Sequence, residues 1–203
     1  RLRPGSPTAA RFPDQRPHDG AGIPTLAAVL AALPDCRFTI EVKTDPAQPD
    51  RTAAAHVMAD ATLAVIDAAG AAGRVIVEAF DWRVQRHIRR TRAEITLAWL
   101  TRPETVRDAA LWWDLTDPGL SVPAAVAAEG GAVWAPDHTA LIAADIEEAH
   151  RSGLLVLAWT VNRPQDMHRL AEWGVDGLIS DRPDLALGLN PQPHQGEDTE
   201  GTN

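Results

Sequence analysis

The stretch from residue 154 to residue 184 constrains the fold of this chain more than any other. It reads LLVLAWTVNRPQDMHRLAEWGVDGLISDRPD, in which two apolar runs flank one short amphipathic segment. Apolar runs of this length, each ending in polar residues, are typical of buried parallel strands that a helix connects. Because parallel-sheet enzymes carry their chemistry on the loops that follow the strands, Trp159 and its neighbours are predicted to lie where a substrate binds.

The same alternation of a short apolar run and a longer helical period extends along most of the chain. Pro164 suits the first turn of a helix, and Gly70, Gly153 and Gly174 stand where C-terminal caps are expected. The pattern predicts a parallel sheet covered by helices, either open or closed into a barrel. The six predicted strands span residues 37–43, 74–79, 94–100, 131–134, 154–160 and 175–180.

Helical spacing of apolar residues predicts which faces of three helices pack on the sheet. The expected core faces are Val57, Ala61, Ala64 and Val65 on the first helix, Ile142, Ile146 and Ala149 on the second, and Met167, Leu170 and Ala171 on the third.

Length and composition restrict the class of protein. With 203 residues, 45% of them hydrophobic, the chain can bury one sizeable core. No apolar run is long enough to span a membrane, so no transmembrane segment is expected. The net charge of -9, without a cluster of Lys and Arg, argues against a nucleic-acid partner. Cys36 is the only cysteine, which fits a reducing compartment, and a cytoplasmic location is expected.

Local composition divides the chain into three parts. Residues 1–22 are rich in Pro and Gly and are predicted to form a loop or linker. Residues 190–203 are polar and carry no large apolar side chain, which predicts a disordered tail. The folded domain is therefore expected between residues 23 and 189.

Glu41 and Lys43 end the first predicted strand and are the leading candidates for a functional site. They stand two positions apart, so both side chains are expected on the same side of the sheet at its carboxyl end. A carboxylate there can bind a divalent metal, and a nearby ammonium can contact a phosphate oxygen. The alternative is a structural ion pair at the rim.

Four further residues are candidates at the same rim. Glu78 and Phe80 share a face of the second strand, although Glu78 and Asp81 could instead cap the helix that follows. Trp159 could form a pocket wall and offer one N–H donor, or simply fill the barrel mouth. Asp137 could line the rim or begin a turn.

The histidines carry no spacing that is typical of metal ligands or catalytic pairs. Those of the folded domain are expected at the surface. They are His56, His87, His138, His150 and His168.

Four segments of the sequence resemble one known family. Residues 40–43 (Ile-Glu-Val-Lys) resemble its Glu-Ile-Lys segment, and residues 23–26 match its Ile-Pro-Thr-Leu entry to a helix. Residues 75–82 resemble its Ser-Phe-Asp strand, with Ala79 in place of the serine. Residues 159–181, with the Gly-Val-Asp-Gly block, resemble its closing segments. This is the glycerophosphodiester phosphodiesterase family.

The resemblance implies a (β/α)8 TIM barrel and metal-dependent hydrolysis of glycerophosphodiesters. The products would be an alcohol, such as choline or ethanolamine, and glycerol 3-phosphate. It also implies that Glu41 binds the divalent ion, Mg²⁺ or Ca²⁺, that Lys43 binds the substrate phosphate, and that Trp159 lies beside the substrate. The expected partner is therefore a small-molecule diester.

The segments that open the family's barrel have no counterpart in this sequence. They are a His-Arg-Gly strand, a Glu-x-Asp metal pair and a His-Asp loop, and His18-Asp19 lacks the continuation of that loop. A complete barrel typically takes about 250 residues. We therefore expect a barrel that lacks about two N-terminal βα units, supplies no catalytic histidine and is inactive alone.

Two other functions remain open at this point. The barrel could be a non-catalytic remnant that binds a phosphate or head group. It could also be another metal-dependent phospholipid phosphodiesterase on a related barrel.

Overall fold

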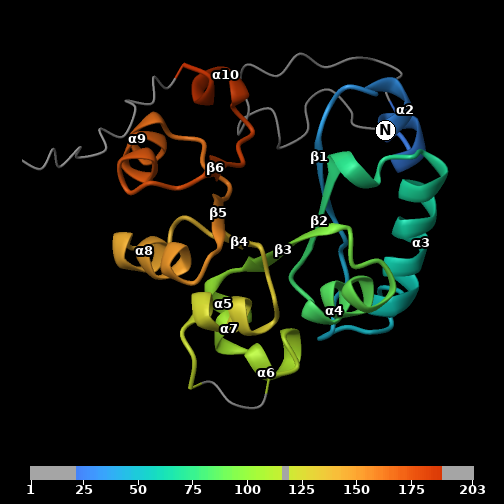
Figure 1. Ribbon diagram of the computed structural model, residues 1–203, viewed down its shortest axis with the longest axis horizontal. Helices are drawn as coiled ribbons and strands as arrows, with labels where there is room; N and C mark the ends of the chain where they lie inside the picture. Colours follow the sequence, from blue (N-terminus) through green and yellow to red (C-terminus); the bar gives the residue numbers. More distant parts are fainter. Residues whose placement is uncertain (1–21, 116–118, 189–203) are drawn as a thin grey trace, which may run out of the picture.

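The structure is a computed structural model that describes residues 22–115 and 119–188. The predicted linker, apart from residue 22, and the predicted tail lie outside these residues, as does His18. Within the described part, six parallel strands lie side by side in chain order, as Figure 1 shows. They are β1 (Phe38–Glu41), β2 (Val75–Ala79), β3 (Thr96–Thr101), β4 (Val133–Pro136), β5 (Leu155–Ala158) and β6 (Gly177–Leu178).

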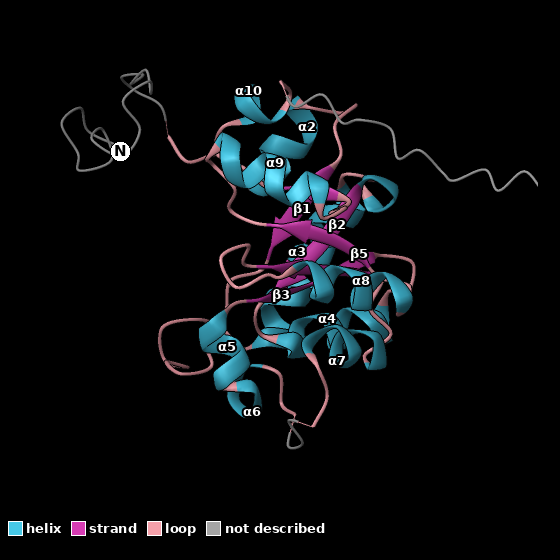
Figure 2. Cartoon of the chain, turned by 90° about the vertical axis from the view of Figure 1, so that its left-hand side faces the viewer, coloured by secondary structure: helices cyan, strands magenta, loops and turns pink. Residues whose placement is uncertain are grey.

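Helices follow the strands and surround the sheet (Figure 2). Each strand after β1 is entered from at least one helical segment, which gives the right length of connection for parallel pairing. The helices are α2 (Leu26–Ala32), α3 (Ala55–Ala68), α4 (Trp82–Thr91), α5 (Pro103–Arg107), α6 (Ala109–Trp112), α7 (Val122–Ala128), α8 (Ala143–Arg151), α9 (Pro164–Glu172) and α10 (Pro183–Ala186), with a 3-10 turn at Ala72–Arg74.

Every predicted strand is present, and the predicted helix signals are confirmed. Pro164 opens α9. Gly70, Gly153 and Gly174 follow the ends of α3, α8 and α9 with φ of 59°, 76° and 85°. These are left-handed conformations, which glycine adopts without the steric cost of a Cβ.

The two faces of the sheet carry different side chains. The outer face is covered by helices: Val75, Val77 and Ala79 of β2 pack against residues of α3 and α4. The opposite face, here called the inner face, carries a separate cluster to which no described helix contributes. Its members are Ile76, Phe80, Ala98, Leu100, Val133, Ala135, Leu157 and Trp159.

Tryptophan side chains fill the helix-covered core between β3, β4 and α4. Trp82 is fully buried, stacks on Trp113 with ring centroids 4.2 Å apart, and meets Trp99 edge-on at 4.9 Å. Such large rings bury much apolar area and stabilise the core on this side.

All three predicted helix faces are wrong in part. On α3 the buried residues are Ala59, Leu63 and Ile66, whereas Val57 is 47% exposed. On α8 Ile146 and Ala149 are buried as predicted, but Ile142 precedes the helix and is 58% exposed. Met167 and Leu170 are buried on α9, and Ala171 is exposed.

The predicted parallel α/β sheet is confirmed in the described part of the chain. In that part of the chain β1 pairs only with β2, and β6 pairs only with β5. The sheet described is therefore open, with β1 and β6 as its edges. No described helix is long and apolar enough to cross a membrane.

Candidate active site at the carboxyl ends of the strands

Two carboxylates lie side by side at the carboxyl ends of β1 and β2. The strand register pairs Glu41 directly with Glu78. Residues at the same register in parallel strands point to the same face of the sheet. Glu78 stands between Ile76 and Phe80, which both belong to the inner-face cluster. Glu41 and Glu78 are therefore neighbours on the inner face.

Glu78 is a buried carboxylate without a full set of partners. It is 7% exposed, and its Oε2 atom has no hydrogen-bond donor in the described part of the chain. Burial, with a further contribution from the charge of Glu41, raises the pKa of Glu78 to about 7, although Lys43 opposes the shift. A buried carboxylate of this kind is stabilised either by a proton or by a cation.

Lys43 forms an ion pair with Glu41, which is the contact that the structural alternative for these two residues describes. The Glu41 side chain is 27% exposed, whereas that of Lys43 is 76% exposed. Val42, which stands between them, is buried, and its backbone N–H donates to the carbonyl oxygen of Glu78 at 2.8 Å. The backbone hydrogen bonding between the first two strands thus continues one residue beyond the end of β1. It holds Lys43 at the rim, with the ammonium group in solvent.

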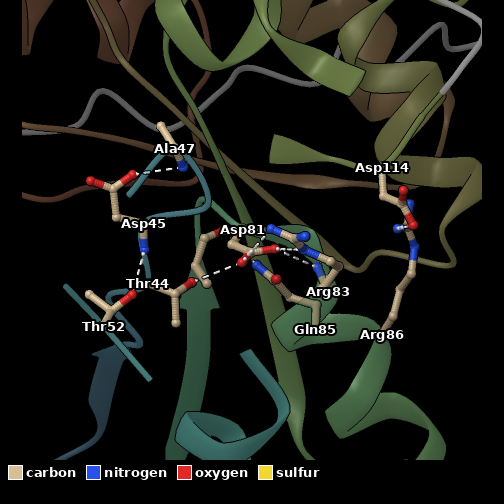
Figure 3. A network of polar contacts seen from close by, with 10 residues as sticks. Thr44, Asp45, Ala47, Thr52, Asp81, Arg83, Gln85, Arg86 and Asp114 are labelled. Carbon is tan, nitrogen blue, oxygen red and sulfur yellow. Dashed lines mark hydrogen bonds and ion pairs between the residues drawn. The ribbon is translucent and has the colours of Figure 1, made fainter. Parts of the chain in front are cut away.

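Asp81 joins the loop after β1 to the start of α4. Its buried carboxylate accepts hydrogen bonds from Thr44 Oγ1 at 3.0 Å, from Arg83 Nε at 2.7 Å and from Arg83 Nη2 at 3.0 Å (Figure 3). It also caps α4 by accepting from the backbone N–H of Arg83. The proposal that Glu78 helps to cap this helix is wrong, since Asp81 alone does so. Asp81 therefore fixes the two loops that follow Glu41 and Glu78.

An aromatic cluster, comprising Phe80, Trp112 and Trp159, lies beside the carboxylates. Phe80 meets Trp159 edge-on with ring centroids 5.4 Å apart, and meets Trp112 edge-on at 6.4 Å. The indole N–H of Trp159 donates to the carbonyl oxygen of Ala135 at 2.8 Å. Trp159 is thus placed as a wall of the site, and its single donor is already used by the backbone.

Arg102 completes this side of the site and was not among the predicted residues. It directly follows β3, and its guanidinium carbon lies 5.0 Å from the centroid of Phe80 and 5.9 Å from that of Trp112. Its position could have been found from the sequence, because Arg102 follows an apolar run in the same way as Lys43. The contribution of Trp112 depends on long-range packing and carries no such signal.

Asp137 lies at the rim, but its carboxylate accepts hydrogen bonds from the loop that follows it. It pairs with Trp159 in an isolated parallel bridge. Its Oδ1 accepts from the backbone N–H of Thr139 at 2.9 Å and from the Thr139 hydroxyl at 2.7 Å. This pattern is a turn in which the aspartate side chain holds the backbone two residues on.

The histidines lie away from the carboxylate pair. His87 contacts Asp60 at 2.6 Å, and His150 contacts Asp176 at 3.0 Å. His138 differs from the surface position expected, because it is half-buried and its Nδ1 has no partner among the described residues. Its backbone N–H donates to the carbonyl oxygen of Trp159 at 2.9 Å.

Carboxylate oxygens are the ligands that Mg²⁺ and Ca²⁺ prefer. The unpartnered Oε2 of Glu78, next to Glu41, therefore fits such an ion. The described residues hold no group of three or more His, Cys, Asp or Glu side chains that could bind a metal. These two glutamates would supply only part of a coordination shell.

Comparison with known proteins identifies relatives over most of the chain. The sequence model of the glycerophosphoryl diester phosphodiesterase family matches residues 1–185. A protein of Mycobacterium tuberculosis (strain ATCC 25618 / H37Rv), named probable glycerophosphodiester phosphodiesterase 2, is 32% identical over 176 residues, which cover 82% of this chain and 59% of that protein.

Solved structures agree with this match. A crystal structure from Silicibacter pomeroyi DSS-3, described as a glycerophosphoryl diester phosphodiesterase, has a TM-score of 0.77 and 33% identity, covering 89% of this chain and 61% of that one. An Oleispira antarctica phosphodiesterase, solved with the product sn-glycerol-3-phosphate, shares the fold with a TM-score of 0.60 at 14% identity, covering 81% of this chain and 60% of that one.

The chain spans 59% of the M. tuberculosis protein and 61% of the S. pomeroyi chain. The family match begins at residue 1, ahead of the Ile-Pro-Thr-Leu segment at residues 23–26. It covers both glutamates of the inner face and the aromatic cluster. The chain belongs to the glycerophosphoryl diester phosphodiesterase family.

Proposed function

We propose that this protein hydrolyses glycerophosphodiesters to an alcohol and glycerol 3-phosphate at the inner rim of its sheet. The observation that carries the proposal is the pairing of Glu41 with the buried, incompletely partnered Glu78 at the carboxyl ends of neighbouring parallel strands. In parallel α/β proteins this end of the sheet is where catalytic groups gather. Membership of the family supplies the reaction class.

We also propose that the six strands form the larger part of a (β/α)8 barrel. Both edges of the described sheet, β1 and β6, have one unused side. Two additional βα units would pair with these edges and close the inner face into a barrel interior. The inner face would then be shielded from bulk water around the carboxylates.

Glu41 and Glu78 are the residues that would hold a divalent cation, Mg²⁺ or Ca²⁺. When bound, such an ion would withdraw charge from the phosphoryl oxygens and lower the barrier to attack on the anionic diester. The protein contributes two oxygen donors from one face, and the network around Asp81 fixes the loops that carry them. Burial of Glu78 makes its charge costly without a cation nearby.

Other residues of the rim would position the substrate. The Lys43 ammonium is exposed and reaches solvent beside Glu41, so it can contact a phosphate oxygen of an incoming diester. The rings of Phe80 and Trp159 form an apolar wall next to the carboxylates. Proton transfer is assigned to no described residue, since no described histidine forms a hydrogen bond or ion pair with Glu41 or Glu78.

The experiment is to incubate a protein that joins this sequence to the two additional βα units proposed above with glycerophosphocholine or glycerophosphoglycerol, and to quantify both products. The 203-residue chain alone, which is expected to be inactive, is the control. Release of glycerol 3-phosphate and free alcohol in equal amounts, dependent on added Mg²⁺ or Ca²⁺, is expected. Release of phosphocholine instead would mean that a different ester bond is cut, and the proposal would be wrong. Binding of the diester without turnover would support the non-catalytic alternative.

A further inference from the structure

Arg102 lies on the aromatic cluster rather than in solvent. It immediately follows β3, and its guanidinium group covers Phe80 at 5.0 Å and Trp112 at 5.9 Å from the ring centroids. Phe80 in turn contacts Trp159. Stacking of a guanidinium on aromatic rings restricts its orientation while leaving its edge free to donate hydrogen bonds.

The hydrogen-bonding capacity of this guanidinium is unused. The Nε atom of Arg102 is buried and makes no hydrogen bond within the described part of the chain. Arg102 forms an ion pair with Glu104, whose Oε2 lies 3.6 Å from Nε, which is too far for a hydrogen bond. The Arg102 side chain is 41% exposed. The side chain is therefore partly accessible, and it donates no hydrogen bond to the described residues.

The position of Arg102 relative to the carboxylates suggests which part of a substrate it meets. Phe80 is two residues beyond Glu78 on the same face, which corresponds to about 7 Å along an extended strand. Glu41, Glu78 and Lys43 would engage the phosphate, as proposed above. A guanidinium stacked on Phe80 would therefore lie next to the group that is esterified to this phosphate, which we take to be the alcohol moiety.

We propose that Arg102 is a specificity-determining residue that favours polyhydroxylated or anionic alcohol moieties and disfavours quaternary ammonium ones. Aromatic faces normally attract quaternary ammonium groups. Here the face of Phe80 is already covered by a permanent positive charge, which repels a second cation and offers hydrogen bonds to hydroxyl or anionic oxygens. The inference rests on the proposed function and defines its substrate class.

The test compares kcat/KM for glycerophosphoinositol and glycerophosphocholine in the wild type and in Arg102→Gln. The wild type is expected to prefer the inositol diester, and the variant is expected to shift the ratio by about tenfold toward choline. Arg102→Lys keeps the charge and should keep most of the preference. Arg107→Gln changes an exposed arginine at the end of α5, the helix that Arg102 precedes; it is the matched control and should leave the ratio unchanged.

Each alternative outcome has a distinct meaning. A wild-type preference for glycerophosphocholine would overturn the inference, and so would equal loss of both activities in Arg102→Gln, which would place Arg102 on the phosphate. If neither diester is hydrolysed, the proposed function fails. The ratio of Kd values for the two diesters, measured by calorimetry on the same folded variants, then decides the inference: a shift in Arg102→Gln supports it, and an unchanged ratio overturns it.

Discussion

Glu41 and Glu78 occupy the same register position on two neighbouring parallel strands, with both carboxylates on the inner face of the sheet. Only one of them is well solvated. Glu41 has an ion pair with Lys43, whereas Glu78 is buried with an unpartnered oxygen. An uncompensated buried carboxylate lowers the stability of the fold, and natural proteins retain such groups mainly at functional sites.

Replacing Glu78 by Gln should stabilise the metal-free protein at alkaline pH. Because the pKa of Glu78 is raised from 4.5 to about 7, the folded state retains a proton between these values that the unfolded state has lost. Stability therefore falls as pH rises from 4.5 to 7 and stays lower above that range, by about 2–3 kcal/mol. Urea unfolding in the presence of a chelator at pH 5 and pH 8 should show this loss in the wild type and not in Glu78→Gln.

A matched control for this experiment is Glu147→Gln, which changes a carboxylate that is 69% exposed on α8. It should keep the pH dependence of the wild type. If Glu78→Gln also kept that dependence, the buried carboxylate would not be its source.

Asp81→Asn should destabilise the protein and loosen the rim. The substitution removes the charge that Arg83 binds through two nitrogens and disturbs the contact with Thr44. Breaking a buried, charge-assisted network of this kind costs about 2–3 kcal/mol. Thermal and urea unfolding measure the loss, and Asp60→Asn, at an exposed pair with His87, should cost less than about 1 kcal/mol. Equal losses of stability in Asp81→Asn and Asp60→Asn would contradict the role of Asp81 in holding the rim loops.

Trp159 should act through its ring and not through its N–H group. Trp159→Phe loses the hydrogen bond to the Ala135 carbonyl but keeps an aromatic contact with Phe80, so a stability loss of about 1 kcal/mol and a KM within about threefold of the wild type are expected. Trp159→Ala removes the wall, and its KM should rise by about tenfold or more. KM is measured by steady-state kinetics. An equal rise in KM for Trp159→Phe and Trp159→Ala would contradict this account.

The strand pattern could be read from the sequence because each strand is a compact apolar run between turn residues. Period-two alternation also placed Glu41 and Lys43 on one face, and Glu78 and Phe80 on one face. The face of α3 could not be predicted in the same way. That helix is rich in alanine on several sides, so spacing alone does not distinguish the buried Leu63 from the exposed Val57.

Sequence patterns do not predict which charged groups of the site find partners after folding. The missing partner of Glu78 depends on which atoms surround it after folding, and so does the unused edge of Arg102. Trp112 reaches the site from α6, which is a short element between β3 and β4 without a clear periodic pattern. Such contacts arise from tertiary packing of segments that are distant from the strand motifs.

The most direct test of the central claim is the effect of Mg²⁺ and Ca²⁺ on the melting temperature of wild type, Glu41→Gln, Glu78→Gln and the control Glu147→Gln. A bound ion stabilises only the form that holds it, so the wild type and the control should melt several degrees higher with the ion than with chelator. Glu41→Gln and Glu78→Gln should lose most of this increase. An increase in both glutamine variants equal to that of the wild type would show that these carboxylates do not hold the metal, and the account of the site would be wrong.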